Sequence, residues 1–179
     1  RIDHERMRAE RLERARKEME HDDLGALVVF AGANIRYITG SYQGNWKYNI
    51  NIRYAVLCRD AEPVLFETAG SDLQCAIIDL PWMKDRIRPA MTWQWAEGAV
   101  GEMADKMVAG ILDVLKENGV EKEKIGVDNF DLPALHAFEK AGINVVNGWP
   151  AFSRARTVKT RDEIECLKQA SSIGDAAMW

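Results

Sequence analysis

Apolar positions along the chain alternate between short continuous runs and segments with helical spacing. Residues 24–30 (LGALVVF) form an apolar, β-branched run of the kind found in buried central strands. Residues 52–58 and 63–66 predict two further strands, and the short stretch 59–62 between them indicates a hairpin. Shorter strands are expected at residues 86–90, 125–128 and 143–146.

Between these runs lie segments with helical periodicity. Residues 3–21 alternate Arg and Glu around one apolar stripe, which predicts a surface helix. The longest helix is expected at 97–118, where Asn118-Gly119 closes it. Further helical segments are a turn or helix at 34–40, a helix at 71–80 with Ser71 and Gln74 as a capping box, and a helix at 131–141 capped by Asp131. Strands and helices that alternate in this way predict an α/β layered domain.

The last stretch of the chain differs in kind. Trp149-Pro150 is expected to break the preceding strand, and Ser153–Lys159 (SRARTVK) is expected to be a basic connector. Thr160 and Glu163 have the spacing of a second capping box. The helix that they open carries one apolar side, formed by Ile164, Leu167, Ala170, Ile173 and Ala177.

Composition and charge narrow the function classes. The 179 residues are 47% hydrophobic and 29% charged, as in one ordinary globular domain. The net charge of -4 argues against a nucleic-acid partner. The longest apolar run is about half of the ~20 residues that a membrane-spanning helix needs, so no membrane partner is expected. Three scattered cysteines, without a C-x-x-C motif, indicate reduced core thiols in a cytoplasmic protein.

The residues provide no recognisable catalytic set. His4, His21 and His136 lie in three separate predicted helices without the spacing of metal ligands. The chain has no G-x-G-x-x-G, Walker or G-x-S-x-G pattern. Asp128 and Asp131 flank a strand end, where a carboxylate usually caps the next helix. We therefore expect no catalytic residue and no metal ligand in these 179 residues.

Four segments, in order, resemble the N-terminal domain of the creatinase/prolidase family, which includes X-Pro aminopeptidases. An Arg/Glu-rich first helix runs into Leu24-Gly25-Ala26-Leu27-Val28-Val29, which is similar to the family's L-D-A-L-L-V strand. Residues 34–40 (NIRYITG) resemble its N-I-R-Y-L-T-G motif, and Ile125-Gly126-Val127-Asp128 with Leu132-Pro133 resembles its I-G-V-D…L-P motif. Arg156-Thr157-Val158-Lys159-Thr160 with Glu163-Ile164 is similar to its R-x-V-K-S-x-x-E-I linker.

The resemblance implies a layered mixed sheet flanked by helices, of the creatinase N-terminal and ribonuclease H-like type. It also implies a division into residues 1–152, the N-terminal domain, and residues 153–179, the linker and first helix of a truncated catalytic domain. The family's metal pair (Mn, Co or Zn) is held by two Asp, one His and two Glu of that catalytic domain, and none of these positions falls within this chain. The implied protein is a cytoplasmic, homodimeric metallohydrolase of the aminopeptidase, dipeptidase or creatinase-like kind. In it, this domain would aid dimerisation and shape the substrate entrance.

One polar, aromatic segment supplies the candidate site. Tyr42, Trp46, Tyr48 and Arg53 are interpreted as a functional edge at the substrate entrance, because large rings leave water only to pack or to bind. The alternative is that they fold beneath the domain as a small core cluster. Trp46 and Arg53, which lie just before residues 54–58, also resemble the corresponding stretch of the family branch that cleaves dimethylsulfoniopropionate.

Two other function classes stay open from the sequence. One is a stand-alone binding module that keeps this fold without a hydrolase domain. The other is a ribonuclease H-like nuclease, which needs clustered carboxylates that the predicted strands nearly lack.

Overall fold

The computed structural model describes residues 2–42 and 52–178 of the chain. Within these ranges, six strands form one mixed sheet in the order β4-β3-β2-β1-β5-β6. The strands are β1 (Ala26–Val29), β2 (Tyr54–Cys58), β3 (Val64–Glu67), β4 (Ile87–Pro89), β5 (Lys124–Val127) and β6 (Asn144–Asn147). The predicted hairpin is confirmed, because β2 and β3 pair antiparallel.

The central strand β1 joins the two halves of the sheet. It pairs antiparallel with β2 and parallel with β5, and all four of its residues are buried. This double-sided burial explains why the run is apolar throughout rather than alternating. The outer pairs β3–β4 and β5–β6 are both parallel.

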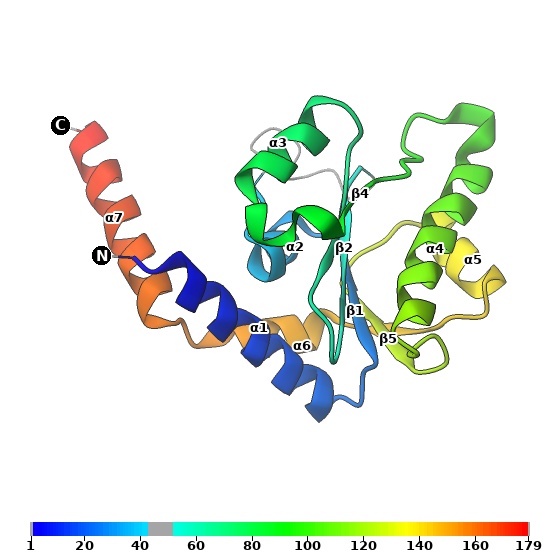
Figure 1. The fold of residues 1–179 in the computed structure, drawn as a ribbon, viewed down its shortest axis with the longest axis horizontal. Coiled ribbons are helices and arrows are strands. Elements are labelled where there is room, and N and C mark those ends of the chain that lie inside the picture. Colours follow the sequence, from blue (N-terminus) through cyan, green and yellow to red (C-terminus); the bar gives the residue numbers. More distant parts are fainter. Residues whose placement is uncertain (1, 43–51, 179) are drawn as a thin grey trace.

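Helices cover both faces of the sheet (Figure 1). The helices are α1 (His4–His21), α2 (Gly32–Thr39), α3 (Ser71–Asp79), α4 (Val100–Glu117), α5 (Leu132–Lys140), α6 (Trp149–Thr157) and α7 (Arg161–Met178), with 3-10 turns η1 (Pro81–Arg86) and η2 (Glu97–Ala99). One core cluster joins α4 and α5 to the sheet, and a second joins α1, α2 and α6 to its other face. The expected α/β fold, a mixed sheet flanked by helices, is confirmed.

The expected connector at Ser153–Lys159 is wrong for most of its length. Residues 149–157 form α6, which runs through the expected domain boundary after residue 152 and packs along α1. Trp149-Pro150 ends the preceding strand as expected, because β6 stops at Asn147. Pro150 lies in the first turn of α6, where its missing N–H would have no intrahelical acceptor. Burial of Ala151, Phe152 and Ala155 holds α6 in the core.

The two predicted capping boxes have different outcomes. The pair at Thr160 and Glu163 is confirmed: the Thr160 N–H donates to Glu163 Oε2 at 2.7 Å, and the Glu163 N–H donates to Thr160 Oγ1 at 3.1 Å. The pair at Ser71 and Gln74 is wrong, because α3 begins at Ser71 itself. The residue before it is Gly70, whose φ of 96° suits a residue without a Cβ.

The cysteines divide between the core and the surface. Cys58 is buried in β2, and burial raises the pKa of its thiol to about 12. Cys75 is exposed and Cys166 is partly exposed. The expected core location is therefore correct for Cys58 and wrong for the other two.

A close backbone approach between β5 and the start of α6 predicts a sensitive glycine. A Cβ on Gly148 would lie 2.7 Å from the carbonyl carbon of Gly126 and 2.8 Å from the nitrogen of Val127. We expect Gly148→Ala to lower the free energy of unfolding by about 1–3 kcal/mol, because backbone atoms must shift to admit the methyl group. Urea denaturation measures this change.

The matched control is Gly174→Ala in α7, where a Cβ would meet no atom within 4 Å. It is expected to be neutral, or stabilising by up to about 1 kcal/mol through helix propensity. Unchanged stability in Gly148→Ala would contradict the packing of α6 against β5.

Candidate functional site

The four residues expected at the substrate entrance are only partly placed by the structure. Trp46 and Tyr48 lie outside the described residues. Tyr42 is 62% exposed, and the Arg36 guanidinium lies 4.8 Å from the centre of its ring. Arg53 is 3% exposed, so its side chain is inside the fold. Tyr42 and Arg53 nevertheless line the same cavity.

Arg53 forms an ion pair with a carboxylate of this same chain. Its Nη2 lies 2.7 Å from Oε2 of Glu67, at the end of β3, and donates to Oγ of Ser41 at 2.5 Å. Burial lowers the pKa of Arg53 and raises that of Glu67, because a low-dielectric interior disfavours both charges. The pair holds the segment before β2 against β3.

The cavity itself has a volume of about 880 Å³ and lies where α1, α2, α6 and the start of α7 meet. We call it the basic cavity, after its cationic lining residues Arg11, Arg36, Arg53, Arg156 and Lys159. Tyr37 and Tyr42 contribute ring surface to its wall. The carboxylate of Glu163 also lines it, and Nε of Arg11 donates to Oε1 of that group at 2.8 Å.

Three of the sequence motifs meet beside the basic cavity in one chain of hydrogen bonds. Nη1 of Arg156 donates to Oδ1 of Asn34 at 2.9 Å, and Nδ2 of Asn34 donates to Oδ2 of Asp128 at 2.8 Å. Asp128 also accepts from the N–H groups of Phe30, at 2.8 Å, and Ala31. Burial raises the pKa of Asp128, while these donors stabilise its ionised form.

The two aspartates bind the amides of different helices. Asp131 caps α5, because its Oδ1 accepts from the Ala134 N–H at 3.0 Å. Asp128 acts on a distant helix instead: it binds the amides before α2, whose own N-cap residue, Ala31, has no side-chain acceptor. Both carboxylates therefore satisfy backbone donors, in keeping with a structural role.

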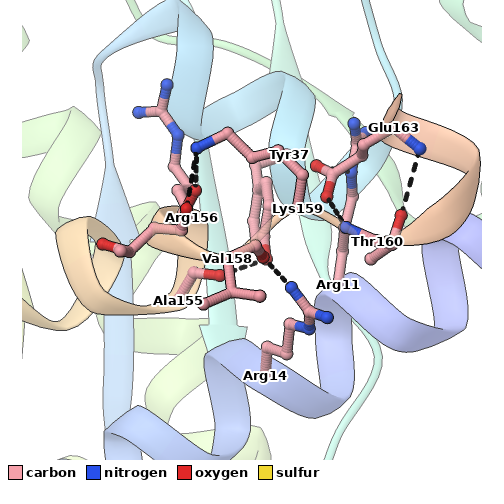
Figure 2. Close-up of polar contacts among 10 residues, drawn as sticks. Arg11, Arg14, Tyr37, Ala155, Arg156, Val158, Lys159, Thr160 and Glu163 are labelled. Carbon is pink, nitrogen blue, oxygen red and sulfur yellow. Dashed lines mark hydrogen bonds and ion pairs between the residues drawn. The ribbon is translucent and has the colours of Figure 1, made fainter. Parts of the chain in front are cut away.

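The turn from α6 to α7 forms one wall of the basic cavity, and Figure 2 shows how it is fastened. The Tyr37 hydroxyl donates to the Ala155 carbonyl at 3.0 Å, and burial raises its pKa to about 12. Arg14 donates to the Val158 carbonyl, and Nζ of Lys159 donates to the Arg156 carbonyl (Figure 2). The turn is thus tied to both α1 and α2.

The first turn of α7 is fixed to α1 by two ion pairs. The Arg6 guanidinium donates to both carboxylate oxygens of Asp162, at 2.8 and 2.9 Å, and holds the pKa of Asp162 below its usual value. Arg11 pairs with Glu163 at 2.8 Å. Beyond this turn, Ile164, Leu167 and Ile173 are exposed, and α7 extends away from the body (Figure 1).

The described residues do not fit a metal pair. Nowhere in residues 2–42 and 52–178 do three His, Cys, Asp or Glu side chains lie close enough to hold a metal ion. In the same ranges, none of the helices is long and apolar enough to cross a membrane.

Comparison with known proteins identifies the fold and the domain. The family model for the "Creatinase/Prolidase N-terminal domain" matches residues 11–158. The dimethylsulfoniopropionate lyase DddP of Roseovarius nubinhibens is 26% identical over 98% of this chain and 40% of its own length. The chain thus spans about two fifths of that curated relative.

Solved structures agree with this match. An Xaa-Pro dipeptidase from Bacillus anthracis has a TM-score of 0.65 at 15% identity, over 96% of this chain and 42% of that one. The N-terminal domain of the cytoplasmic peptidase PepQ from Mycobacterium tuberculosis has a TM-score of 0.57 at 18% identity, over 82% of this chain and 98% of that one. At these identities the likeness shows the fold alone.

Proposed function

This chain belongs to the creatinase/prolidase N-terminal domain family, and from that premise we propose that it is the non-catalytic domain of a two-domain, metal-dependent hydrolase of the Xaa-Pro dipeptidase or aminopeptidase type. The observation that carries the proposal is the family match over residues 11–158. Among the described residues, no three His, Cys, Asp or Glu side chains lie close enough together to hold a metal ion. In this proposal a divalent metal pair (Mn, Co or Zn) is held by a catalytic domain of which α7 is the first helix. The protein would act in the cytoplasm as a homodimer.

Within that enzyme, the edge formed by Tyr42, Trp46, Tyr48 and Arg53 would narrow the substrate entrance. Tyr42 supports this role because it is exposed, lines the basic cavity and has Arg36 over its ring. Arg53 would act as a positioning residue, because its buried side chain links Ser41, the neighbour of Tyr42, to Glu67 of the sheet.

A second candidate function is cleavage of dimethylsulfoniopropionate. The curated relative that carries this activity in its name aligns with 98% of the chain, and a second lyase of that name, from Roseobacter denitrificans, aligns with 85%. Turnover of Xaa-Pro dipeptides and of dimethylsulfoniopropionate by the two-domain protein separates the two functions. Activity toward neither substrate, with any of the three metals, would overturn both.

The exposed side of α7 predicts where the catalytic domain docks. We expect replacement of Ile164, Leu167 and Ile173 by Gln to leave the thermal midpoint of the 179-residue chain within about 2 °C, because these side chains contribute little to its core. Self-association, measured by sedimentation, should fall, since an uncovered apolar stripe is a common contact between copies.

Ile78→Gln on α3 is the matched control, because Ile78 is an exposed isoleucine outside this stripe. It should leave sedimentation unchanged. A loss of several degrees in the triple variant would instead show that α7 belongs to the core of this domain.

A further inference from the structure

We propose that the basic cavity is a binding site for a small, multiply charged oxyanion, a di- or tricarboxylate or a phosphate. The proposal rests on the charges and geometry of this chain and holds whether or not the proposed enzymatic function is correct. Four observations carry it: uncompensated cations, their fixed positions, the first turn of α2 in the cavity wall and a buried guanidinium with an unpaired donor.

The cations of the basic cavity outnumber the carboxylates that could neutralise them. Arg11 is paired with Glu163, and Arg53 is paired with Glu67. Arg36, Arg156 and Lys159 form no ion pair with any carboxylate in the described part of the chain, and residues 43–51 contain no Asp or Glu. Three positive charges therefore converge on one cavity in a protein whose net charge is -4. Such a concentration of positive charge attracts anions.

The three cations are held in place by neutral partners, so their charges remain available. Arg156 is fixed by Oδ1 of Asn34 at 2.9 Å. Lys159 donates to the carbonyls of Arg156 and Thr157 at the end of α6. Arg36 lies over the Tyr42 ring. Preorganised cations bind an anion with less loss of side-chain entropy than free ones, and a guanidinium can bind a carboxylate or phosphate through two parallel hydrogen bonds.

The first turn of α2 and a buried guanidinium add to the site. Gly32 and Ala33 line the basic cavity at the first turn of α2. The N–H groups of Phe30 and Ala31, which precede them in the sequence, donate to the Asp128 carboxylate. First-turn N–H groups of a helix favour an anion. Arg53 also lines the cavity, and its buried Nε has no hydrogen-bond partner among the described residues. A buried donor left unpaired is costly, so an acceptor in the cavity would relieve that cost.

Isothermal titration calorimetry of the metal-free 179-residue chain tests this site. The probes are inorganic phosphate, citrate and acetate, compared at constant ionic strength set with sodium chloride. Phosphate and citrate are expected to bind saturably, and at least about tenfold more tightly than acetate, because three positive charges favour a multiply charged ligand. The stronger of the two distinguishes a phosphate site from a carboxylate site.

Arg36→Gln and Lys159→Gln should each weaken binding of the stronger probe about tenfold, the typical effect of losing one charge-assisted hydrogen bond. Both side chains are exposed, and circular dichroism checks that each variant is folded. Lys116→Gln, on the exposed surface of α4 across the sheet, is the control and should leave affinity unchanged.

The proposal is overturned if neither phosphate nor citrate gives saturable heat up to about 10 mM. It is also overturned if both variants bind as the unaltered chain does, or if Lys116→Gln weakens binding equally, since this would mean general attraction to a charged surface. None of these results depends on metal or on turnover, so they are independent of the proposed hydrolase or lyase activity.

Discussion

Glu67→Leu is expected to lower the free energy of unfolding by about 3–5 kcal/mol, the usual effect of removing one partner from a buried ion pair. Both side chains of the Arg53–Glu67 pair are almost fully buried, so the change leaves the guanidinium without a compensating charge in a low-dielectric environment. The measurement is equilibrium unfolding in urea with circular dichroism detection.

Two further variants make this result specific. The double change Arg53→Met with Glu67→Leu should recover most of the lost stability, because no uncompensated charge then remains. Glu102→Gln, which breaks an exposed ion pair with Lys106 on α4, should cost less than about 1 kcal/mol. Equal losses in Glu67→Leu and Glu102→Gln would show that Arg53 is not held inside the fold.

The second large effect is expected at Asp128, whose replacement by Ala should cost about 2–4 kcal/mol. The carboxylate accepts from two backbone N–H groups and from Nδ2 of Asn34, and each donor left buried without an acceptor costs on the order of 1–3 kcal/mol. Thermal and urea unfolding of Asp128→Ala measure the loss.

A double-mutant cycle with Asn34→Ala identifies the mechanism. The two changes should be non-additive by at least about 0.5 kcal/mol, because they remove the same hydrogen bond. Asp113→Ala, an exposed aspartate on α4, is the control and should change stability by less than about 0.5 kcal/mol. Additive losses at Asp128 and Asn34 would contradict a shared network.

Local features of the sequence predicted most of the fold. The buried strand at 24–30, the hairpin and the capping box at Thr160 and Glu163 depend on neighbouring residues, and each was found in the structure. The same local reasoning was wrong for most of 153–159. The basic, polar sequence there suggests a connector, whereas packing against α1, a distant segment, favours a helix that continues to Thr157.

The candidate site was only partly predictable for the same reason. The aromatic segment around Tyr42 drew attention by its composition, but Arg36, Arg156 and Lys159 lie in two motifs more than 100 residues apart. No local pattern indicates that these cations meet at one cavity or that they lack carboxylate partners. The pairing of Arg53 with Glu67 likewise depends on the register between β2 and β3.

Three of the motifs that carried the family resemblance are joined by hydrogen bonds in the structure. Asn34, Asp128 and Arg156 come from three different motifs, yet they form one hydrogen-bonded chain that joins α2, the end of β5 and α6. Arg156 of this hydrogen-bonded network and Glu163, which lies at the start of α7 and pairs with Arg11, line the same cavity.

The most direct test of the proposed role compares turnover by the purified 179-residue chain with turnover by the two-domain protein. Xaa-Pro dipeptides and dimethylsulfoniopropionate are supplied to each protein with Mn²⁺, Co²⁺ or Zn²⁺, and again with a chelator. We expect no turnover by the chain, and metal-dependent turnover of one substrate class by the two-domain protein. Turnover by the pure chain at an enzyme-like rate, or chelator-resistant activity of the two-domain protein, would contradict a non-catalytic domain in a metal-dependent enzyme.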